Sequence, residues 1–136
     1  MECTNIEHIG IAVKNLENSI RFYEDVLGLK CYLIEEIKDQ KVRTAFFMIG
    51  QTKIELLEST DPDGSIGRFI EKRGEGVHHI AFSVKGLGQS LTELESKGIQ
   101  LIDDKPRKGA EGFDIAFIHP QSAFGVLTEL CEKREI

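Results

Sequence analysis

Apolar and polar positions change their spacing along this chain in an order that occurs twice. Residues 5–13 are rich in Ile and Val and predict a strand. Apolar positions three or four residues apart follow between Asn15 and Gly28, a spacing typical of a helix with one buried face. Three short apolar runs bounded by turn residues then predict strands at 30–37, 42–49 and 53–58. The first half therefore predicts strand, helix and three strands.

The predicted helix has clear signals at both ends. Asn15 or Asn18 can cap its N-terminus, and Gly28 can end it. The positions expected on its buried face are Leu16, Ile20, Tyr23, Val26 and Leu27.

The second half predicts the same order of elements. A strand at 77–84 precedes a helix from about Gly88 to Lys97, and further strands are expected near 99–103, 113–119 and 125–132. Between the halves, residues 59–76 open with the turn-forming STDPDGS. A short helix, IGRFIEKRG, should follow, with Ile66, Phe69 and Ile70 facing inward.

An internal repeat underlies this agreement. Ile6-Glu7-His8-Ile9 matches Val77-His78-His79-Ile80 at an offset of 71 residues, and Ile54-Glu55-Leu56 matches Thr128-Glu129-Leu130 at an offset of 74. A half of about 65 residues would bury only a marginal core alone. We therefore expect one α+β domain spanning 1–136, with βαβββ modules at 4–58 and 77–133 and a linker at 59–76.

Alternation along the first strand of each module separates the histidines. His8 should share a face with Gly10 and Ala12, and His79 with Ala81 and Ser83, while His78 points to the opposite face. Small residues on the face of His8 and His79 predict open volume beside them, which is the shape of a ligand cavity. His78 is expected to be structural or on the surface.

Two glutamates stand among apolar strand residues, Glu55 in KIELL and Glu129 in VLTEL. An unpaired buried carboxylate is costly, so such a residue is normally protonated, paired or bound to metal. Together with His8 and His79 they form a set of four that the repeat relates pairwise. Imidazole and carboxylate suit a divalent ion such as Co, Ni, Zn, Mn or Fe. The lack of thiolate argues against a purely structural zinc site.

Structural alternatives exist for each residue type. A lone strand histidine is more often a hydrogen-bonded core residue than a ligand, and a strand glutamate can face solvent at an edge, as Glu58 and Glu132 are expected to do. Cys131 shares the face of Glu129 and is expected to fill the core. Because the repeat relates both pairs, it favours the metal site.

Composition and charge exclude several classes. The net charge is −6 and there is no long Lys/Arg cluster, so the sequence lacks the basic patch that is typical of nucleic-acid-binding proteins. No apolar run approaches the ~20 residues of a membrane span, and the N-terminus has no secretory signal pattern. Three widely spaced cysteines without C-x-x-C fit reduced thiols. We expect a soluble cytoplasmic protein without nucleic-acid or membrane partners.

Several motifs together resemble a known superfamily. They are HIGIAV at 8–13, TKIELL at 52–57, GEGVHHIAF at 74–82, AFIHP at 116–120 and GVLTEL at 125–130. HIGIAV resembles the vicinal oxygen chelate superfamily, whose paired βαβββ modules form a half-open, cup-shaped barrel around one divalent metal. The other motifs resemble its methylmalonyl-CoA epimerase family over nearly the whole chain.

The resemblance implies an activity and a site. It implies metal-dependent interconversion of the two C2 epimers of methylmalonyl-CoA through an enolate, in a homodimer. The implied metal is Co²⁺ first, with Zn²⁺, Ni²⁺ or Mn²⁺ as alternatives. The implied ligands are His8, Glu55, His79 and Glu129. Glu129 is expected to act as base as well, with Glu55 or a metal-bound water opposite.

Substrate contacts are expected from loops. Arg107 and Lys108, in the basic loop 105–109, are candidates for the CoA phosphates, although a solvated basic turn explains them equally well. His119, in an Ile-His-Pro turn, is expected near the cavity mouth, and Phe124 is expected to shape the pocket.

Two departures from the family pattern concern the same site. Some family members carry a further glutamate, proposed as a base, on the strand before the second ligand, where Arg43 and Thr44 stand here. Phe124 replaces the small or polar residue usual before Gly125. Two alternatives remain open: glyoxalase I, which uses the same ligand types on a glutathione hemithioacetal, and a non-catalytic binding protein of this fold.

Overall fold

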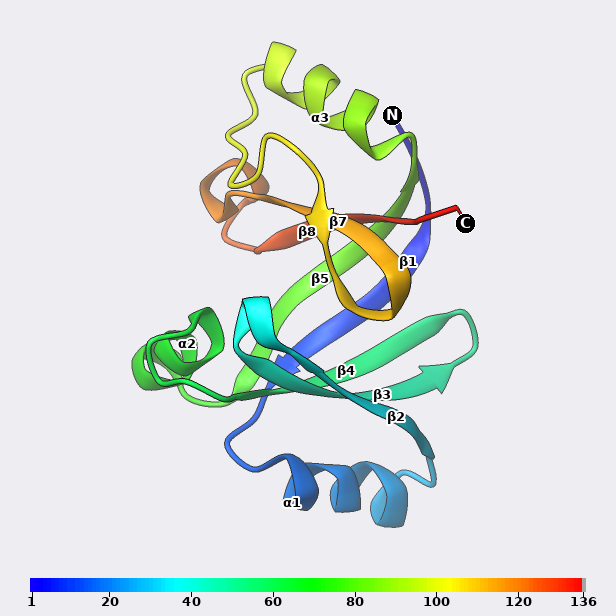
Figure 1. Cartoon of the computed structure of the whole chain (residues 1–136), viewed down its shortest axis with the longest axis vertical. Helices are drawn as coiled ribbons and strands as arrows, with labels where there is room; N and C mark the ends of the chain where they lie inside the picture. Colours follow the sequence, from blue (N-terminus) through cyan, green and yellow to red (C-terminus); the bar gives the residue numbers. More distant parts are fainter. Residues whose placement is uncertain (136) are drawn as a thin grey trace. The chain divides into compact units, whose positions relative to one another are not determined.

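The computed structural model of the chain describes residues 1–135, whose strands belong to one sheet (Figure 1). The strands are β1 (Glu2–Ala12), β2 (Cys31–Ile37), β3 (Val42–Ile49), β4 (Thr52–Ser59), β5 (Gly76–Lys85), β6 (Arg107–Lys108), β7 (Phe113–Ile118) and β8 (Thr128–Lys133). Hydrogen bonds connect them in the order β2-β3-β4-β1-β5-β8-β7-β6. β1 pairs parallel with β4 and β5 parallel with β8, and the outer pairs are antiparallel. The predicted repeat is therefore also a repeat of topology.

Within residues 1–135, three α-helices and four shorter helical turns connect the strands. The helices are α1 (Leu16–Arg21), α2 (Ser65–Arg73) and α3 (Leu87–Ser96), and the turns are η1 (Phe22–Val26), η2 (Lys38–Gln40), η3 (Ala110–Gly112) and η4 (Pro120–Ala123). No helix among the described residues is long and apolar enough to cross a membrane.

The chain divides into two compact units. The N-terminal unit is His8–His78, and the C-terminal unit joins Met1–Glu7 to the chain from His79 onward. The division falls inside β1 and β5, immediately before His8 and His79.

Helices cover the sheet of the N-terminal unit through two apolar clusters. On one face Leu16 of α1 packs with Ala45, Phe47 and Leu56, and Figure 1 shows α1 running along β2, β3 and β4. On the other face Ile66 of α2 packs with Ala12 in a cluster that also contains Val42 and Leu57.

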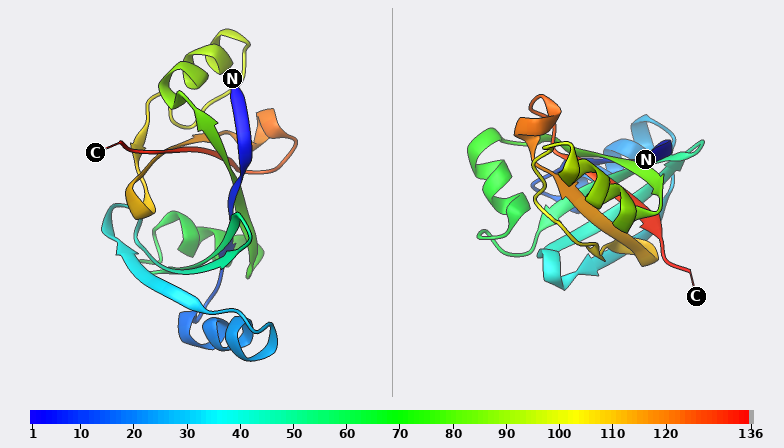
Figure 2. Two further views of the ribbon diagram at one scale, coloured as in Figure 1. Left: turned by 90° about the vertical axis from the view of Figure 1, so that its right-hand side faces the viewer. Right: turned by 90° about the horizontal axis from the view of Figure 1, so that it is seen from above.

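The C-terminal unit has the same plan. Leu87, Leu91 and Leu94 of α3 pack on one face of the sheet, in a cluster that includes Leu130 of β8. Figure 2 shows the start of β1 beside this helix, where the Met1 amino group lies 2.7 Å from a Glu93 carboxylate oxygen. The opposite face carries a smaller cluster: Ala81, Ile115, Phe117 and Cys131. Cys131 is fully buried there, which confirms the prediction that it fills the core.

In both modules, a carboxylate from the last strand accepts backbone N–H groups at the start of the helix that follows the first strand. The Glu58 carboxylate accepts the Leu16 N–H at 2.9 Å, and the Glu132 carboxylate accepts the N–H groups of Gly86 and Leu87 at 2.7 and 2.9 Å. Each carboxylate satisfies a backbone donor that the helix leaves free and complements the positive end of the helix dipole. The prediction that Glu58 and Glu132 face solvent at an edge is therefore wrong.

Arg43 also forms a hydrogen bond with Glu58. It donates to Glu58 at 3.0 Å and to Glu17 at 3.3 Å, and the hydrogen bond to Glu17 is the main cause of the raised pKa of the guanidinium. The predicted cap is also present, since the Asn15 side chain accepts the Asn18 N–H at 2.8 Å.

Four further details differ from the sequence predictions. The first helix changes at Phe22 to the wider turn η1, which alters the angular spacing and leaves Val26 and Leu27 exposed rather than buried. The strand expected at 99–103 is wrong: Leu101 makes one isolated bridge to Ile118. The Phe117 N–H donates to the Asp103 carboxylate rather than to a backbone carbonyl of a neighbouring strand.

The third and fourth differences concern the last strand and the small residues. β8 begins at Thr128 rather than at 125, because Phe124 and Gly125 adopt positive φ angles of 56° and 90° in the turn before it. Ala12 and Ala81 are fully buried in apolar clusters, so the prediction that they leave open volume is wrong.

Candidate metal centre

Within the N-terminal unit, His8 and Glu55 form a buried pair. The parallel register of β1 and β4 places Glu55 beside Gly10, which lies on the face of His8 and has no side chain. His8 Nδ1 lies 3.1 Å from Glu55 Oε2, and each residue is 6% exposed. The two residues therefore lie together, and their role as metal ligands stays a prediction.

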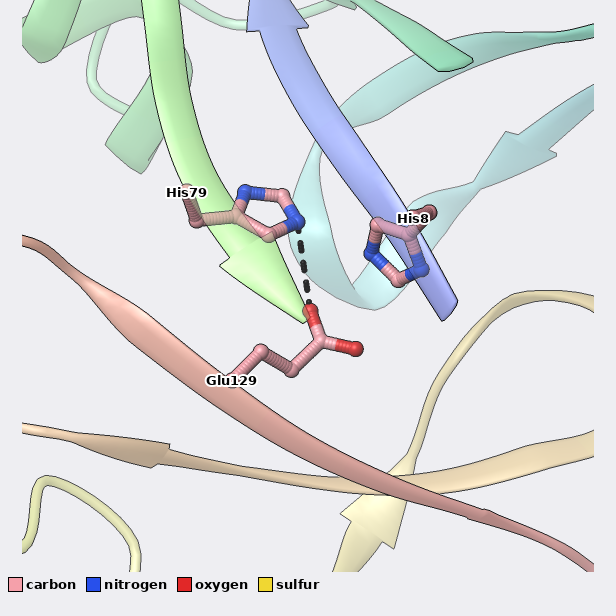
Figure 3. Close-up of side chains that lie close together, drawn as sticks. All are labelled: His8, His79 and Glu129. Atoms are coloured by element: carbon pink, nitrogen blue, oxygen red, sulfur yellow. Dashed lines mark ion pairs between the residues drawn. The ribbon is translucent and has the colours of Figure 1, made fainter. Parts of the chain in front are cut away.

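The C-terminal unit contains the equivalent pair, His79 and Glu129. The parallel register of β5 and β8 places Glu129 beside Ala81, two residues after His79. His79 Nε2 lies 3.2 Å from Glu129 Oε1, the contact drawn as a dashed line in Figure 3. The two residues are 5% and 3% exposed, and the His79 ring meets the Phe117 ring edge-on at 5.6 Å.

The chemistry of both pairs suits a divalent cation. A neutral imidazole nitrogen and a carboxylate oxygen are ligands for borderline metals, and each pair holds one of each at hydrogen-bonding distance. Burial excludes competing water and raises the cost of leaving a carboxylate uncompensated. Each unit can therefore offer one imidazole nitrogen and at least one carboxylate oxygen to a metal.

The neighbouring His78 has a different environment, as the alternation predicted. It is half-buried, and its ring packs edge-on against Phe69 of α2 with 4.9 Å between centroids. The side chains of these two adjacent histidines thus lie on opposite faces of β5.

The sequence analysis did not identify two buried charged residues. Glu7 and Lys53 are each 7% exposed. Lys53 is paired in register with His8 and lies two residues before Glu55, so it shares their face. Lys53 and Glu55 are two residues apart on one strand, and this spacing could have identified Lys53 as a neighbour of the site from the sequence.

The predicted substrate-binding residues lie on the surface or at its edge. Arg107 and Lys108 are exposed on β6; the Arg107 Nε lies 3.3 Å from Asp103 Oδ1, and the guanidinium stands 5.4 Å from the centre of the Phe117 ring. His119 caps η4, its Nδ1 accepting the Gln121 N–H at 3.0 Å. Phe124 is fully exposed in the turn after η4. Their contacts with a substrate remain predictions.

Comparison with known proteins assigns the class. The model of the Glyoxalase/Bleomycin resistance protein/Dioxygenase superfamily matches residues 7–117. The chain belongs to this superfamily, and the predicted α+β fold of paired βαβββ modules is confirmed.

Within the superfamily, the chain is similar to methylmalonyl-CoA epimerases over nearly its whole length. It is 32% identical over 126 residues to the human mitochondrial methylmalonyl-CoA epimerase, covering 92% of this chain and 72% of that one. A variant of the Streptomyces coelicolor methylmalonyl-CoA epimerase, in complex with 2-nitronate-propionyl-CoA, is 36% identical with a TM-score of 0.95, covering 99% and 98% of the two chains. The uncharacterized protein YqjC of Bacillus subtilis is 46% identical over 129 residues, covering 95% and 92%. The resemblance recognised in the sequence is confirmed.

Proposed function

We propose that this protein is a metal-dependent epimerase that interconverts (R)- and (S)-methylmalonyl-CoA. The observation that carries the proposal is the pair of buried His–Glu contacts, His8–Glu55 and His79–Glu129, which the internal repeat relates. Epimerases among the relatives at near-full coverage support the substrate and the reaction.

The two pairs together are proposed to hold one divalent ion: Co²⁺, or alternatively Zn²⁺, Ni²⁺ or Mn²⁺. When bound, such an ion supplies a Lewis acid for the negative charge that develops on the thioester oxygen. The burial of the four side chains supports this role, because a site that excludes water strengthens electrostatic stabilisation.

The proton transfer is assigned to carboxylates of the chain. Epimerisation breaks the C2–H bond on one face and forms a C2–H bond on the other, with no net change in oxidation state. We assign removal of the proton to Glu129, with Glu55 as the group on the opposite side. The deep burial of both residues supports the assignment.

The CoA moiety is assigned to the surface residues. Arg107 and Lys108 carry positive charge on the exposed strand β6, which suits phosphate groups. His119 and Phe124 are the residues proposed to bound the acyl pocket.

We also propose a cytoplasmic homodimer. Tyr32, Leu33 and Ile34 on β2 and Met48 and Ile49 on β3 are exposed apolar side chains on neighbouring strands, and exposed apolar side chains of this kind support association. Light scattering on the purified protein should give twice the mass of 15.3 kDa, whereas a monomer would exclude the dimer.

Deuterium incorporation at C2 of methylmalonyl-CoA in heavy water tests the function. The protein is stripped of metal and then reloaded with cobalt; exchange with interconversion of the epimers should appear only after reloading. His79→Ala should lose metal and exchange, while the control His78→Ala, at a half-buried position that faces away, should retain both.

Two outcomes would reject the proposal. Protein that demonstrably holds metal but shows no exchange would not be an epimerase, and the glutathione hemithioacetal of glyoxalase I would be tested next. Protein that binds no metal and turns over neither substrate would favour a non-catalytic binding protein.

A further inference from the structure

Lys53 is a buried cationic residue on the face of the His8–Glu55 pair. It is 7% exposed, and no other lysine or arginine among the described residues of the N-terminal unit is buried. Lys53 is paired in register with His8 and lies two residues before Glu55 on β4, so the three side chains share one face. One strand spacing, about 4.8 Å, separates its backbone from that of His8. A lysine therefore lies directly beside the candidate metal ligands of this unit.

The position of Lys53 also connects the pair to an exposed part of the sheet. The residue opposite Lys53 on β3 is Met48, which is 49% exposed, whereas His8 on β1 is buried. Residues directly opposite each other on paired strands point to the same face. This row across the sheet thus runs from an exposed position through Lys53 to a buried one. A ligand group that approaches the pair along the row meets Lys53 first.

A lysine at this position favours an anionic ligand. Burial of an ammonium group is costly unless anions or hydrogen-bond acceptors compensate it. Lys53 interacts within the chain, and an ammonium group has three donors, so an oxygen of a ligand can share it with a partner in the chain. Hydrogen bonds between an ammonium and a carboxylate are about twice as strong as those between neutral groups. A carboxylate is therefore the ligand group that Lys53 suits best.

The proposed substrate carries such a group at its reacting carbon. C2 of methylmalonyl-CoA bears a free carboxylate in addition to the thioester, and this carboxylate distinguishes it from neutral branched acyl thioesters. In the proposed site the metal acts on the thioester oxygen, and no residue has yet been assigned to the carboxylate.

We propose that Lys53 binds the free carboxylate of the substrate and thereby selects 2-carboxyacyl thioesters over neutral acyl thioesters; this rests on the proposed epimerase function. The Lys53 ammonium group donates to a carboxylate oxygen, and this contact fixes C2 relative to His8 and Glu55. Lys53 is a specificity-determining residue in this assignment, and the C2 proton is transferred by other groups.

Equilibrium binding of two CoA thioesters to Lys53→Met tests the inference. Isobutyryl-CoA has a methyl group where methylmalonyl-CoA has its free carboxylate, and methionine keeps an apolar stem without the charge. Calorimetry with cobalt-loaded protein should show methylmalonyl-CoA binding weakened by about 10-fold or more. Isobutyryl-CoA binding and cobalt content should stay at the wild-type values. Lys30→Met, at an exposed position of the same unit, is the matched control and should bind both thioesters as wild type does.

Three results would overturn the assignment. Lys53→Met could bind methylmalonyl-CoA as tightly as wild type, it could lose affinity for both thioesters equally, or wild-type protein could bind isobutyryl-CoA as tightly as methylmalonyl-CoA. The last comparison needs no variant, so the inference can be tested even if Lys53→Met does not fold. Failure of the proposed function is a separate result, because wild-type protein holding cobalt would then show no C2 exchange even where it prefers methylmalonyl-CoA.

Discussion

At the scale of single residues, neighbouring side chains of the same type have different roles because alternate strand positions face opposite sides. His79 contacts Glu129, while the adjacent His78 packs on Phe69. Glu55 lies beside His8, while Glu58, an odd number of residues further on, turns to the other face and contacts α1. The chemistry of each residue therefore depends on its face rather than on its type.

Glu129→Gln separates the roles proposed for that residue. The amide keeps the size of the side chain but is neither an anionic ligand nor a base, so interconversion should fall by about 10²–10⁴-fold. Metal content and C2 exchange are measured together. A variant that retains metal and turns over fully would contradict the role of Glu129 as base.

Asp61 predicts a pH-dependent contribution to stability. Its pKa is lowered, first by the Asp63 N–H that donates to Oδ1 at 2.9 Å and then by Lys41, whose Nζ lies 3.5 Å from Oδ2. A folded-state pKa below the unfolded value of 3.8 gives stability that is present above pH 3.8 and is lost as the pH falls through the folded value. Asp61→Asn should therefore lower the free energy of unfolding at neutral pH.

Denaturant titrations of both proteins from pH 7 to pH 2.5 measure this contribution. The difference between wild type and Asp61→Asn should shrink as the pH falls below 3.8. A difference that stays constant over the whole range would show that the carboxylate charge has no part in it.

At the scale of elements, each module ties its last strand to the start of its first helix through a carboxylate. Glu58 and Glu132 occupy equivalent positions of the repeat and accept N–H groups at the starts of α1 and α3. These hydrogen bonds orient each helix on its sheet, and the sheet in turn positions the His–Glu pair on the opposite face.

Glu132→Ala should destabilise the protein by about 0.5–2 kcal/mol, the usual cost of losing a helix cap. The variant leaves the backbone donors of Gly86 and Leu87 without their carboxylate partner. Glu95→Ala is the control, since Glu95 is exposed on the same helix. Equal unfolding free energies for the two variants would contradict a capping role.

Leu16→Ala tests the packing of α1. Leu16 is fully buried against Phe47 and Leu56, so its truncation should cost about 2–5 kcal/mol. Val26→Ala, on the exposed turn η1 of the same connection, should change stability by less than about 0.5 kcal/mol. A large loss at Val26 would indicate that this residue is covered in solution.

At the scale of the whole molecule, the same βαβββ plan occurs in each half, and each half contributes one buried imidazole and one buried carboxylate. Burying two carboxylates and two imidazoles is costly for so small a protein unless they are compensated. A bound cation would provide that compensation and would make stability depend on metal.

Removal of metal should therefore lower the thermal midpoint. Ligand binding to the folded state adds about 2.7 kcal/mol when the free metal concentration is 100 times the dissociation constant. Calorimetry with cobalt and with a chelator measures the change, and His79→Ala should show none. An unchanged midpoint in wild-type protein that loses its metal would contradict this coupling.

The sequence by itself determined the elements and the faces of their side chains. Spacings of two and of three or four residues are local, so β3 at 42–49, α2 and the opposed faces of His78 and His79 were predictable. The repeat also related His8 to His79 and Glu55 to Glu129 before any contact was known.

Only the tertiary structure decided which groups meet. A periodicity does not specify which strand edges pair or where a long side chain ends. The caps made by Glu58 and Glu132 were therefore not predicted. These features depend on pairing between segments distant in sequence, and that pairing arises when the apolar faces are buried together.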